Sequence, residues 1–171
     1  LLPATPDLID TEDVLHRDAL AVMHGVFLHE VGHARHTTVA LPADGSPAGT
    51  AARLLEEIRM EAAAVRDDAG AARFLRAAAR KLIVGEQTVV GPGLAAVAAA
   101  ALTAGRVLAG SLQPEDLEPI REALADALPE AVAAELQTIW GEAIATPDGE
   151  LERLLGLADR MVAIAERTAH D

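Results

Sequence analysis

The amino-acid sequence predicts an all-α fold, and three observations support that prediction. Just over half of the 171 residues are apolar, and alanine supplies much of that share, which favours helix. The chain holds two phenylalanines, one tryptophan and no tyrosine, so that its packing must rely on close contacts between helices. Prolines stand near the starts of the later apolar segments, at Pro92, Pro119, Pro129 and Pro147. The length fits one domain, or a compact unit with a small appendage.

The first long helix is expected at residues 18–37, after a looped or extended segment at 1–11. It has one apolar stripe and, nearly opposite, a second face that carries His29 and His33. A helix that is apolar on two sides predicts a central position, packed all round. Gly25 and Gly32 lie beside the histidines and suggest that another backbone comes close there. The apolar stripe consists of Leu20, Met23, Phe27, Val31 and Ala34.

A second helix is expected at residues 50–68, after a loop of turn residues. The helical wheel places Glu61 at the edge of its apolar stripe, with Glu57 just beyond, whereas Glu56 points almost directly away, toward solvent. Glu57, rather than Glu56, is therefore the acid that can join the two histidines in a shared site. Glu61 is half-buried and needs a partner, and a histidine N–H would serve. The stripe consists of Ala51, Leu54, Leu55, Ile58, Ala62 and Val65.

The remaining chain predicts a third helix at 70–83 and four more near 92–110, 116–128, 130–146 and 148–168. The alanine-rich run 94–105 is expected in the core, and Trp140 anchors the C-terminal group. We therefore divide the chain into a helical core that carries His29, His33 and Glu57 (1–83), a connector (84–92) and a C-terminal helical cover (93–171). In the third helix the residues expected to face inward are Ala71, Phe74, Leu75, Ala78 and Leu82.

The chain is organised around an HExxH motif, which runs from His29 to His33. Two histidines four apart on a helix lie about 40° apart around its axis, so their imidazoles can share one metal ion, typically zinc. The glutamate beside the first histidine, Glu30, is then placed to act as general base. With Glu57 as a third ligand, a fourth position stays open for water, as in catalytic zinc sites.

Composition excludes several classes of partner. With 27 acidic and 14 basic residues the net charge is −13, which argues against binding to nucleic acid or to an anionic membrane surface. No segment has the roughly 20 strongly apolar residues of a transmembrane span. The chain has no cysteine, hence neither disulfides nor a thiolate site, which is compatible with the cytoplasm.

The phrases His-Glu-Val-Gly-His-Ala-Arg-His-Thr and Leu-Leu-Glu-Glu-Ile-Arg-Met-Glu-Ala resemble the gluzincin pattern of zinc metallopeptidases, and also uncharacterised peptidase-like proteins of high-GC bacteria and their phages. The resemblance covers about residues 18–80. It implies ligands at His29, His33 and Glu57, a general base at Glu30 and outer support from Glu61. Metzincins fit less well, because His36 occupies the position of their conserved glycine. Gluzincins place a β-sheet before the motif, and 28 residues leave room for little of it.

These features predict a zinc-dependent metallopeptidase that hydrolyses peptide or protein substrates, as part of a polypeptide that can carry further domains. His36 and Arg59 are candidates for the rim of the site or for stabilising an oxyanion. The alternative is a non-catalytic zinc-binding scaffold, or a degenerate one, closed by a fourth protein ligand for which His36 is the nearest candidate. A metal-free helical interaction domain is a third possibility.

Overall fold

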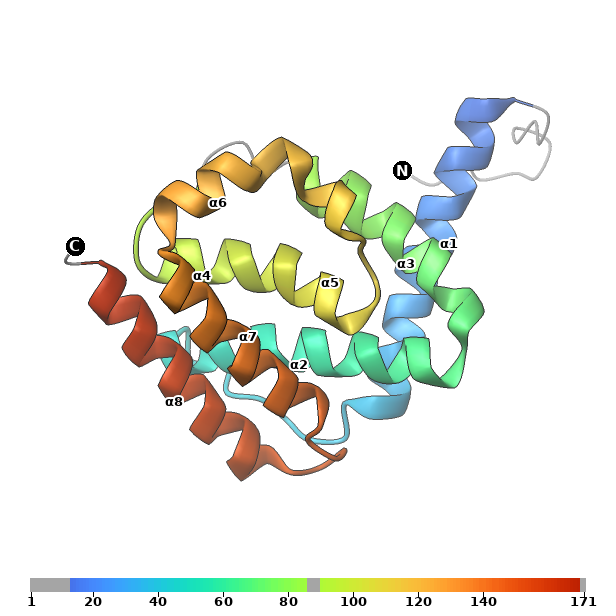
Figure 1. Cartoon of the computed structure of the whole chain (residues 1–171). Coiled ribbons are helices and arrows are strands. Elements are labelled where there is room, and N and C mark those ends of the chain that lie inside the picture. The colour runs from blue at the N-terminus through green and yellow to red at the C-terminus, as the bar shows by residue number, and fades with distance from the viewer. Residues whose placement is uncertain (1–12, 86–89, 170–171) are drawn as a thin grey trace.

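A computed structural model describes residues 13–85 and 90–169, and within these ranges the chain is helical with no β-strand (Figure 1). The all-α prediction is confirmed. None of the described helices is both long and apolar enough to cross a membrane. The segment 1–11, predicted to be looped, and the middle of the 84–92 connector lie outside the described residues. The main helices are α1 (Val14–His36), α2 (Pro47–Asp67), α3 (Ala72–Ala79), α4 (Leu94–Ala100), α5 (Arg106–Ala109), α6 (Arg121–Ala127), α7 (Glu130–Ile144) and α8 (Leu151–Thr168).

Shorter turns extend several of these helices. A 3₁₀ turn at Ala69–Ala71 and a π-turn at Arg80–Val84 flank α3, a second π-turn at Ala101–Gly105 joins α4 to α5, and a 3₁₀ helix at Pro114–Ile120 precedes α6. The predicted segments 70–83, 92–110 and 116–128 therefore exist as composite helices. The second helix begins earlier than predicted because Ser46 caps it: its Oγ accepts a hydrogen bond from Gly49 N at 3.0 Å, and Pro47 follows at the first helical position.

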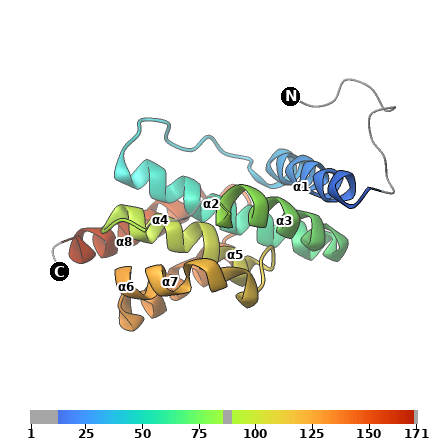
Figure 2. The ribbon, with the colours of Figure 1, turned by 90° about the horizontal axis from the view of Figure 1, so that it is seen from above.

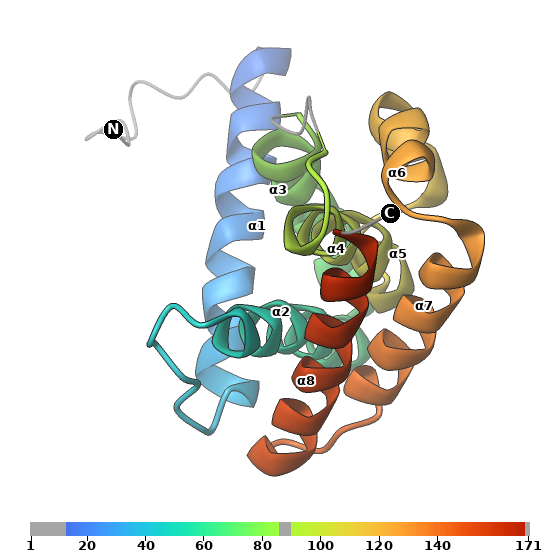
Figure 3. The ribbon, with the colours of Figure 1, turned by 90° about the vertical axis from the view of Figure 1, so that its left-hand side faces the viewer.

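The prediction that the HExxH helix is central is wrong, because α2 holds that place. Figures 2 and 3 show α1 along one edge of the molecule, beside α3, while α2 runs between α1 and the C-terminal helices. The exposed fraction of Phe27 is 60%, and Met23 and Val26 are also exposed. The spacing of apolar residues shows which side chains share a helix face, but not whether another element covers that face. Part of the apolar surface of α1 is therefore exposed rather than packed.

The main hydrophobic cluster forms around α2 and draws on α4, α7 and α8. Trp140 is buried in it, as predicted, and so is most of the alanine-rich run of α4. No side chain of α1 belongs to this cluster within the described residues. Because the cluster includes residues from both sides of the 84–92 connector, α2 is held chiefly by the second half of the chain. The division into a core and a cover stays a prediction.

Close packing at Gly25 joins α1 to α3. A Cβ atom built on Gly25 would lie 2.0 Å from the carbonyl oxygen of Phe74, so a backbone does approach there, as predicted. Gly32 differs, because a Cβ atom there would meet the Met60 side chain, 2.4 Å from its sulfur, rather than a backbone. Two glycines therefore let α1 approach a backbone carbonyl of α3 and the Met60 side chain of α2.

The π-turn after α3 changes which residues face inward. Leu82 was expected to face the core, but it is exposed, whereas Val84 is buried. A π-turn adds one residue to a helical turn, which rotates the following side chains by about 100° relative to an uninterrupted α-helix. Ala71, Leu75 and Ala78, which precede the turn, are buried as predicted, and Phe74 is half-buried.

We predict that Gly25→Ala destabilises the fold, because the new methyl group meets a backbone carbonyl that cannot move aside cheaply. The expected loss in free energy of unfolding is about 1–3 kcal/mol, as for other overpacked sites. Gly141→Ala in α7 is the matched control, since a Cβ there has nothing within 4 Å. It should gain up to about 1 kcal/mol from helix propensity. Urea unfolding of both variants measures the two effects, and equal stability would contradict the close approach at Gly25.

Candidate metal centre

His29, His33 and Glu57 meet where α1 crosses α2. Glu57 Oε2 lies 3.3 Å from His29 Nε2, and Glu57 Oε1 lies 3.2 Å from His33 Nε2. One ligand atom from each residue lies within 4.8 Å of the others, and no further group of this kind occurs among the described residues. Zinc bonds of 2.0–2.2 Å in a tetrahedron place neighbouring donor atoms about 3.4 Å apart. The spacing therefore fits a shared metal ion.

Each histidine is held by its second ring nitrogen. His33 Nδ1 lies 2.9 Å from Thr37 Oγ1, whose single hydrogen is donated to Glu56 Oε1 at 2.6 Å. His33 Nδ1–H must then be the donor to that hydroxyl, because a hydroxyl carries only one hydrogen. His29 Nδ1 lies 3.1 Å from Glu61 Oε1, and an ionised carboxylate can only accept. Both rings are thus fixed with the hydrogen on Nδ1.

This arrangement leaves both Nε2 atoms facing Glu57 as lone pairs when the rings are neutral. Lone pairs at 3.2–3.3 Å from carboxylate oxygens repel unless a cation lies between them. A proton can supply that charge, and so can a metal ion. Metal-binding histidines commonly donate their other N–H to a carboxylate or hydroxyl in this way. The arrangement of the two rings and the carboxylate therefore fits a site with a cation at its centre better than an empty one.

Glu61 is a deeply buried carboxylate of the centre, with 3% of its surface exposed. Arg106 Nε donates to both of its oxygens, at 3.1 and 3.0 Å, and the hydroxyl of Ser111 donates to Oε2. Burial raises the pKa of Glu61, but the hydrogen bond from His29 and the charge of Arg106 outweigh it and lower the pKa overall. Glu61 is therefore ionised and can accept the His29 hydrogen.

The His33–Glu57 pair shifts both pKa values. The hydrogen bond to Glu57 raises the pKa of His33 above its ordinary value of 6.5, against the lowering effect of burial. Burial raises the pKa of Glu57, but the hydrogen bond with His33 and the charges of His29 and Arg106 lower it below 4.5 overall. Without a metal, a proton shared with His33 supplies the missing positive charge.

Glu56 does not point toward solvent, and that prediction is wrong. Only 2% of its surface is exposed, and Arg59 donates to both of its oxygens at 2.7 Å. Arg59 also donates to Asp148 and, at 2.7 Å, to the His36 carbonyl oxygen. The helical wheel failed because α2 is covered on nearly every side, so even the face opposite the apolar stripe is buried. The choice of Glu57 over Glu56 as the residue facing the histidines agrees with the geometry.

The other candidate residues lie around this centre. Glu30 is exposed, and within the described residues its side chain makes no hydrogen bond or ion pair. His36 does not face the three ligands: its Nδ1 lies 3.3 Å from Asp148 Oδ2, and its Nε2 lies 3.3 Å from Asp67 Oδ2 in a geometry that forms no hydrogen bond. Arg59 is buried in its contacts with Glu56 and Asp148.

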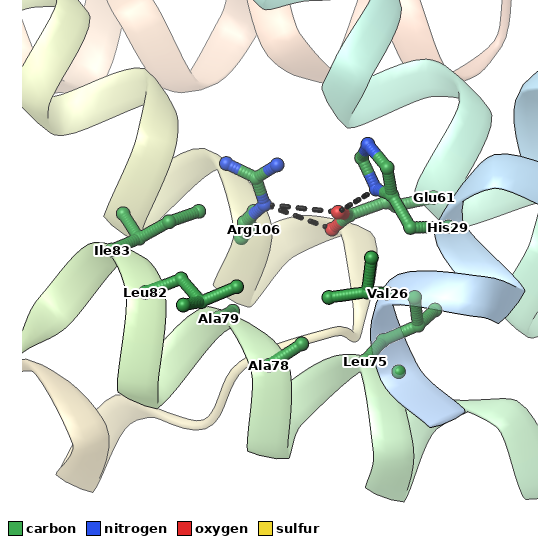
Figure 4. A pocket seen from close by; sticks show the side chains of 10 residues that line it. Val26, His29, Glu61, Leu75, Ala78, Ala79, Leu82, Ile83 and Arg106 are labelled. Atoms are coloured by element: carbon green, nitrogen blue, oxygen red, sulfur yellow. Dashed lines mark hydrogen bonds and ion pairs between the residues drawn. The ribbon is translucent and has the colours of Figure 1, made fainter. Parts of the chain in front are cut away.

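A cavity of about 250 Å³ adjoins the centre, shown in Figure 4. His29, Glu61 and Arg106 lie together at one side of it. The rest of the lining is mainly apolar and comes from α1, α3 and the π-turn that follows, including Val26, Leu75, Ala79 and Ile83.

Sequence reasoning missed Thr37, Arg106 and Ser111. For Arg106 a signal existed: a single cation closes a long apolar helical segment, and a charge in such a place requires a buried partner. Nothing in the local pattern indicated that the partner would be Glu61. Thr37 stands four residues after His33, within reach of a helical side chain, but threonines at that spacing are common on helix surfaces.

The structure thus contains a His29–His33–Glu57 group that could bind a metal ion. Comparison of the chain with protein-family models, curated proteins and solved structures gives no match, so the resemblance to gluzincins rests on the residues quoted for it.

We predict that the purified protein binds one equivalent of zinc and that Glu57→Gln weakens the affinity at least about 100-fold, beyond the 10–100-fold effect of losing an outer partner. The amide keeps the volume of the side chain but removes its charge. Glu152→Gln, on the exposed face of α8, is the control for loss of one negative charge. Competition with a chromophoric chelator measures both affinities. Equal affinities of the two variants would exclude Glu57 as a ligand.

We also predict opposite effects of pH on the metal-free and zinc-loaded protein. In the metal-free protein the raised pKa of His33 gives stability that is full below pH 6.5 and is lost as pH rises through the folded pKa. The lowered pKa of Glu57 gives stability that is full above pH 4.5 and is lost as pH falls through its folded pKa. The pair therefore stabilises the metal-free protein fully between pH 4.5 and 6.5.

Zinc affinity should instead rise with pH until His33 is neutral, because the metal must displace the proton from Nε2. Calorimetry in buffers of different ionisation enthalpy would count the protons released. Release of no proton at pH 6 would show that His33 is not protonated in the metal-free centre.

Proposed function

We propose that this chain forms the catalytic centre of a zinc-dependent peptidase, with His29, His33 and Glu57 as ligands. The observation that carries the proposal is the convergence of two Nε2 lone pairs and one carboxylate, each ring being fixed by a hydrogen bond from Nδ1. That geometry supports a metal site. Zinc is proposed because two imidazoles and one carboxylate are ligands it commonly takes in hydrolases.

The number of ligands favours catalysis over a structural role. Three protein ligands leave the fourth position of a zinc ion open for water. A zinc ion held by these ligands would lower the pKa of that water and polarise a substrate carbonyl. Glu30 follows His29 in the chain and is exposed, so that a water or substrate can reach its carboxylate. Glu30 takes the proton from the attacking water and returns it to the leaving amine. Neither His36 nor Arg59 belongs to this mechanism, because Asp148 engages both.

The second candidate is a non-catalytic metal site that ties α1 to α2. One observation favours it: the described residues contain no strand whose edge could pair with a peptide substrate. Against a closed site stands His36, the nearest fourth ligand, which faces Asp67 and Asp148 instead. We therefore rank the peptidase first and expect any substrate to be held by side chains, or by other parts of the polypeptide.

We predict that Glu30→Gln keeps zinc and lowers the rate of peptide hydrolysis by about 10²–10⁴-fold, the usual contribution of a general base. Zinc affinity should change far less than in Glu57→Gln, because the Glu30 side chain forms no hydrogen bond or ion pair with a ligand residue and acts on His33 only through its charge. The assay follows cleavage of a mixed peptide library by mass spectrometry, with zinc, with a chelator, and with zinc restored.

Glu152→Gln again serves as the control, and it should cleave like the unaltered protein. Turnover by Glu30→Gln at the unaltered rate would remove Glu30 from the mechanism. A zinc-loaded protein that cleaves no peptide in the library would favour the scaffold.

A further inference from the structure

Arg106 connects the second half of the chain to the candidate metal centre. Only 3% of its surface is exposed, and its guanidinium reaches two acids of α2 at once. Nη2 donates to Glu57 Oε2 at 3.1 Å, while Nε donates to both oxygens of Glu61. Nη1 lies 3.3 Å from the Leu102 carbonyl oxygen. One side chain therefore contacts a candidate ligand and the residue that orients His29.

The two acids need such a cation because their charges repel. Glu57 and Glu61 stand four residues apart on α2, which places them on neighbouring turns of one face. Both must keep their positions for the centre to work, because Glu57 faces the two Nε2 atoms and Glu61 accepts the hydrogen of His29 Nδ1. Glu61 is buried and Glu57 is partly buried, so a cation in contact with both offsets the repulsion between them. A guanidinium suits this role, since its planar fork can serve two carboxylates together.

The local fold delivers Arg106 to that position. The π-turn at Ala101–Gly105 ends immediately before it, and its extra residue rotates Arg106 by about 100° relative to a continuous α-helix. At Gly105 the helix lies so close to α2 that a Cβ atom would be 2.5 Å from Ile58 Cδ1. This close approach brings the guanidinium within reach of α2. Ser111, one turn beyond, adds a hydrogen bond to Glu61.

We propose that Arg106 is a positioning residue of the candidate metal centre, which holds Glu57 and Glu61 in place through simultaneous contact with both. The proposal rests on the metal-binding part of the proposed function, but not on catalysis. It assigns to the C-terminal half of the chain a direct part in metal affinity.

The test compares Arg106→Gln and Arg106→Lys with Arg76→Gln. Arg76 is the matched control, since it also pairs with carboxylates across elements, Asp116 and Glu115, but away from the metal centre. Two quantities are measured for each folded variant: zinc affinity, by chelator competition, and the visible spectrum of the cobalt-substituted protein, which reports the ligand number and geometry. Circular dichroism and urea unfolding establish folding and stability.

We expect Arg106→Gln to weaken zinc binding by about 10–100-fold and to alter the cobalt spectrum, as losses of outer partners do. The zinc affinity of Arg106→Lys should lie between those of Arg106→Gln and the unaltered protein, because a lysine keeps the charge but cannot contact both acids in the same way. Arg76→Gln should lose stability without a change in either reading. The double variant Arg106→Gln/Glu61→Gln should be less impaired than the two single effects combined, because both act on the same ligand geometry.

Zinc affinity and a cobalt spectrum in Arg106→Gln equal to those of the unaltered protein would overturn the proposal, and so would equal losses in Arg106→Gln and Arg76→Gln. If Arg106→Gln does not fold, Arg106→Lys decides, and unaltered zinc affinity and cobalt spectrum in that variant count against the proposal.

The same experiments separate this proposal from the proposed function. Zinc binding that depends on Arg106, without cleavage of any peptide, would refute only the peptidase. Normal cleavage and affinity in Arg106→Gln would refute only the positioning role, and absence of zinc binding in the unaltered protein would refute both.

Discussion

A buried carboxylate is the constraint around which this molecule is arranged. Glu61 lies in the interior of α2, where an ionised acid is tolerated only if hydrogen bonds and opposite charge compensate for the lost water. The compensation comes from three places in the chain: His29 on α1, Arg106 on α5 and Ser111 just after it. These contacts join α1 and α5 to α2 at the candidate metal centre.

The same requirement recurs one turn earlier on α2. Glu56 is buried against Arg59 and Thr37, and Thr37 in turn accepts the hydrogen of His33. The two imidazoles are therefore oriented by two separate buried acids of one helix, while the third acid, Glu57, faces the space between the rings. Helix α2 combines the main hydrophobic cluster with the polar network of the site, which explains why it, rather than the HExxH helix, is central.

The helices could be predicted from local spacing, whereas the meeting of Glu57 with the two histidines was expected from the resemblance to gluzincins. His29 and His33 share a face at four residues apart, and the wheel of the second helix separates Glu57 from Glu56. What failed depends on contacts that are distant in the chain. The burial of Glu56, the exposure of Phe27 and the place of Arg106 are set by which elements cover which faces. The exposure of Leu82 depends on a π-turn, which no simple periodicity reveals.

The long separation between Glu61 and its counter-charge has a consequence for biosynthesis. Arg106 follows Glu61 by 45 residues, so a growing chain exposes the histidines and acids well before the cation that completes their surroundings is made. Closing so long a loop costs conformational entropy that the contacts of the folded chain must offset. We therefore expect the growing chain to lack the full set of contacts around Glu61 until synthesis has passed α5 and Ser111.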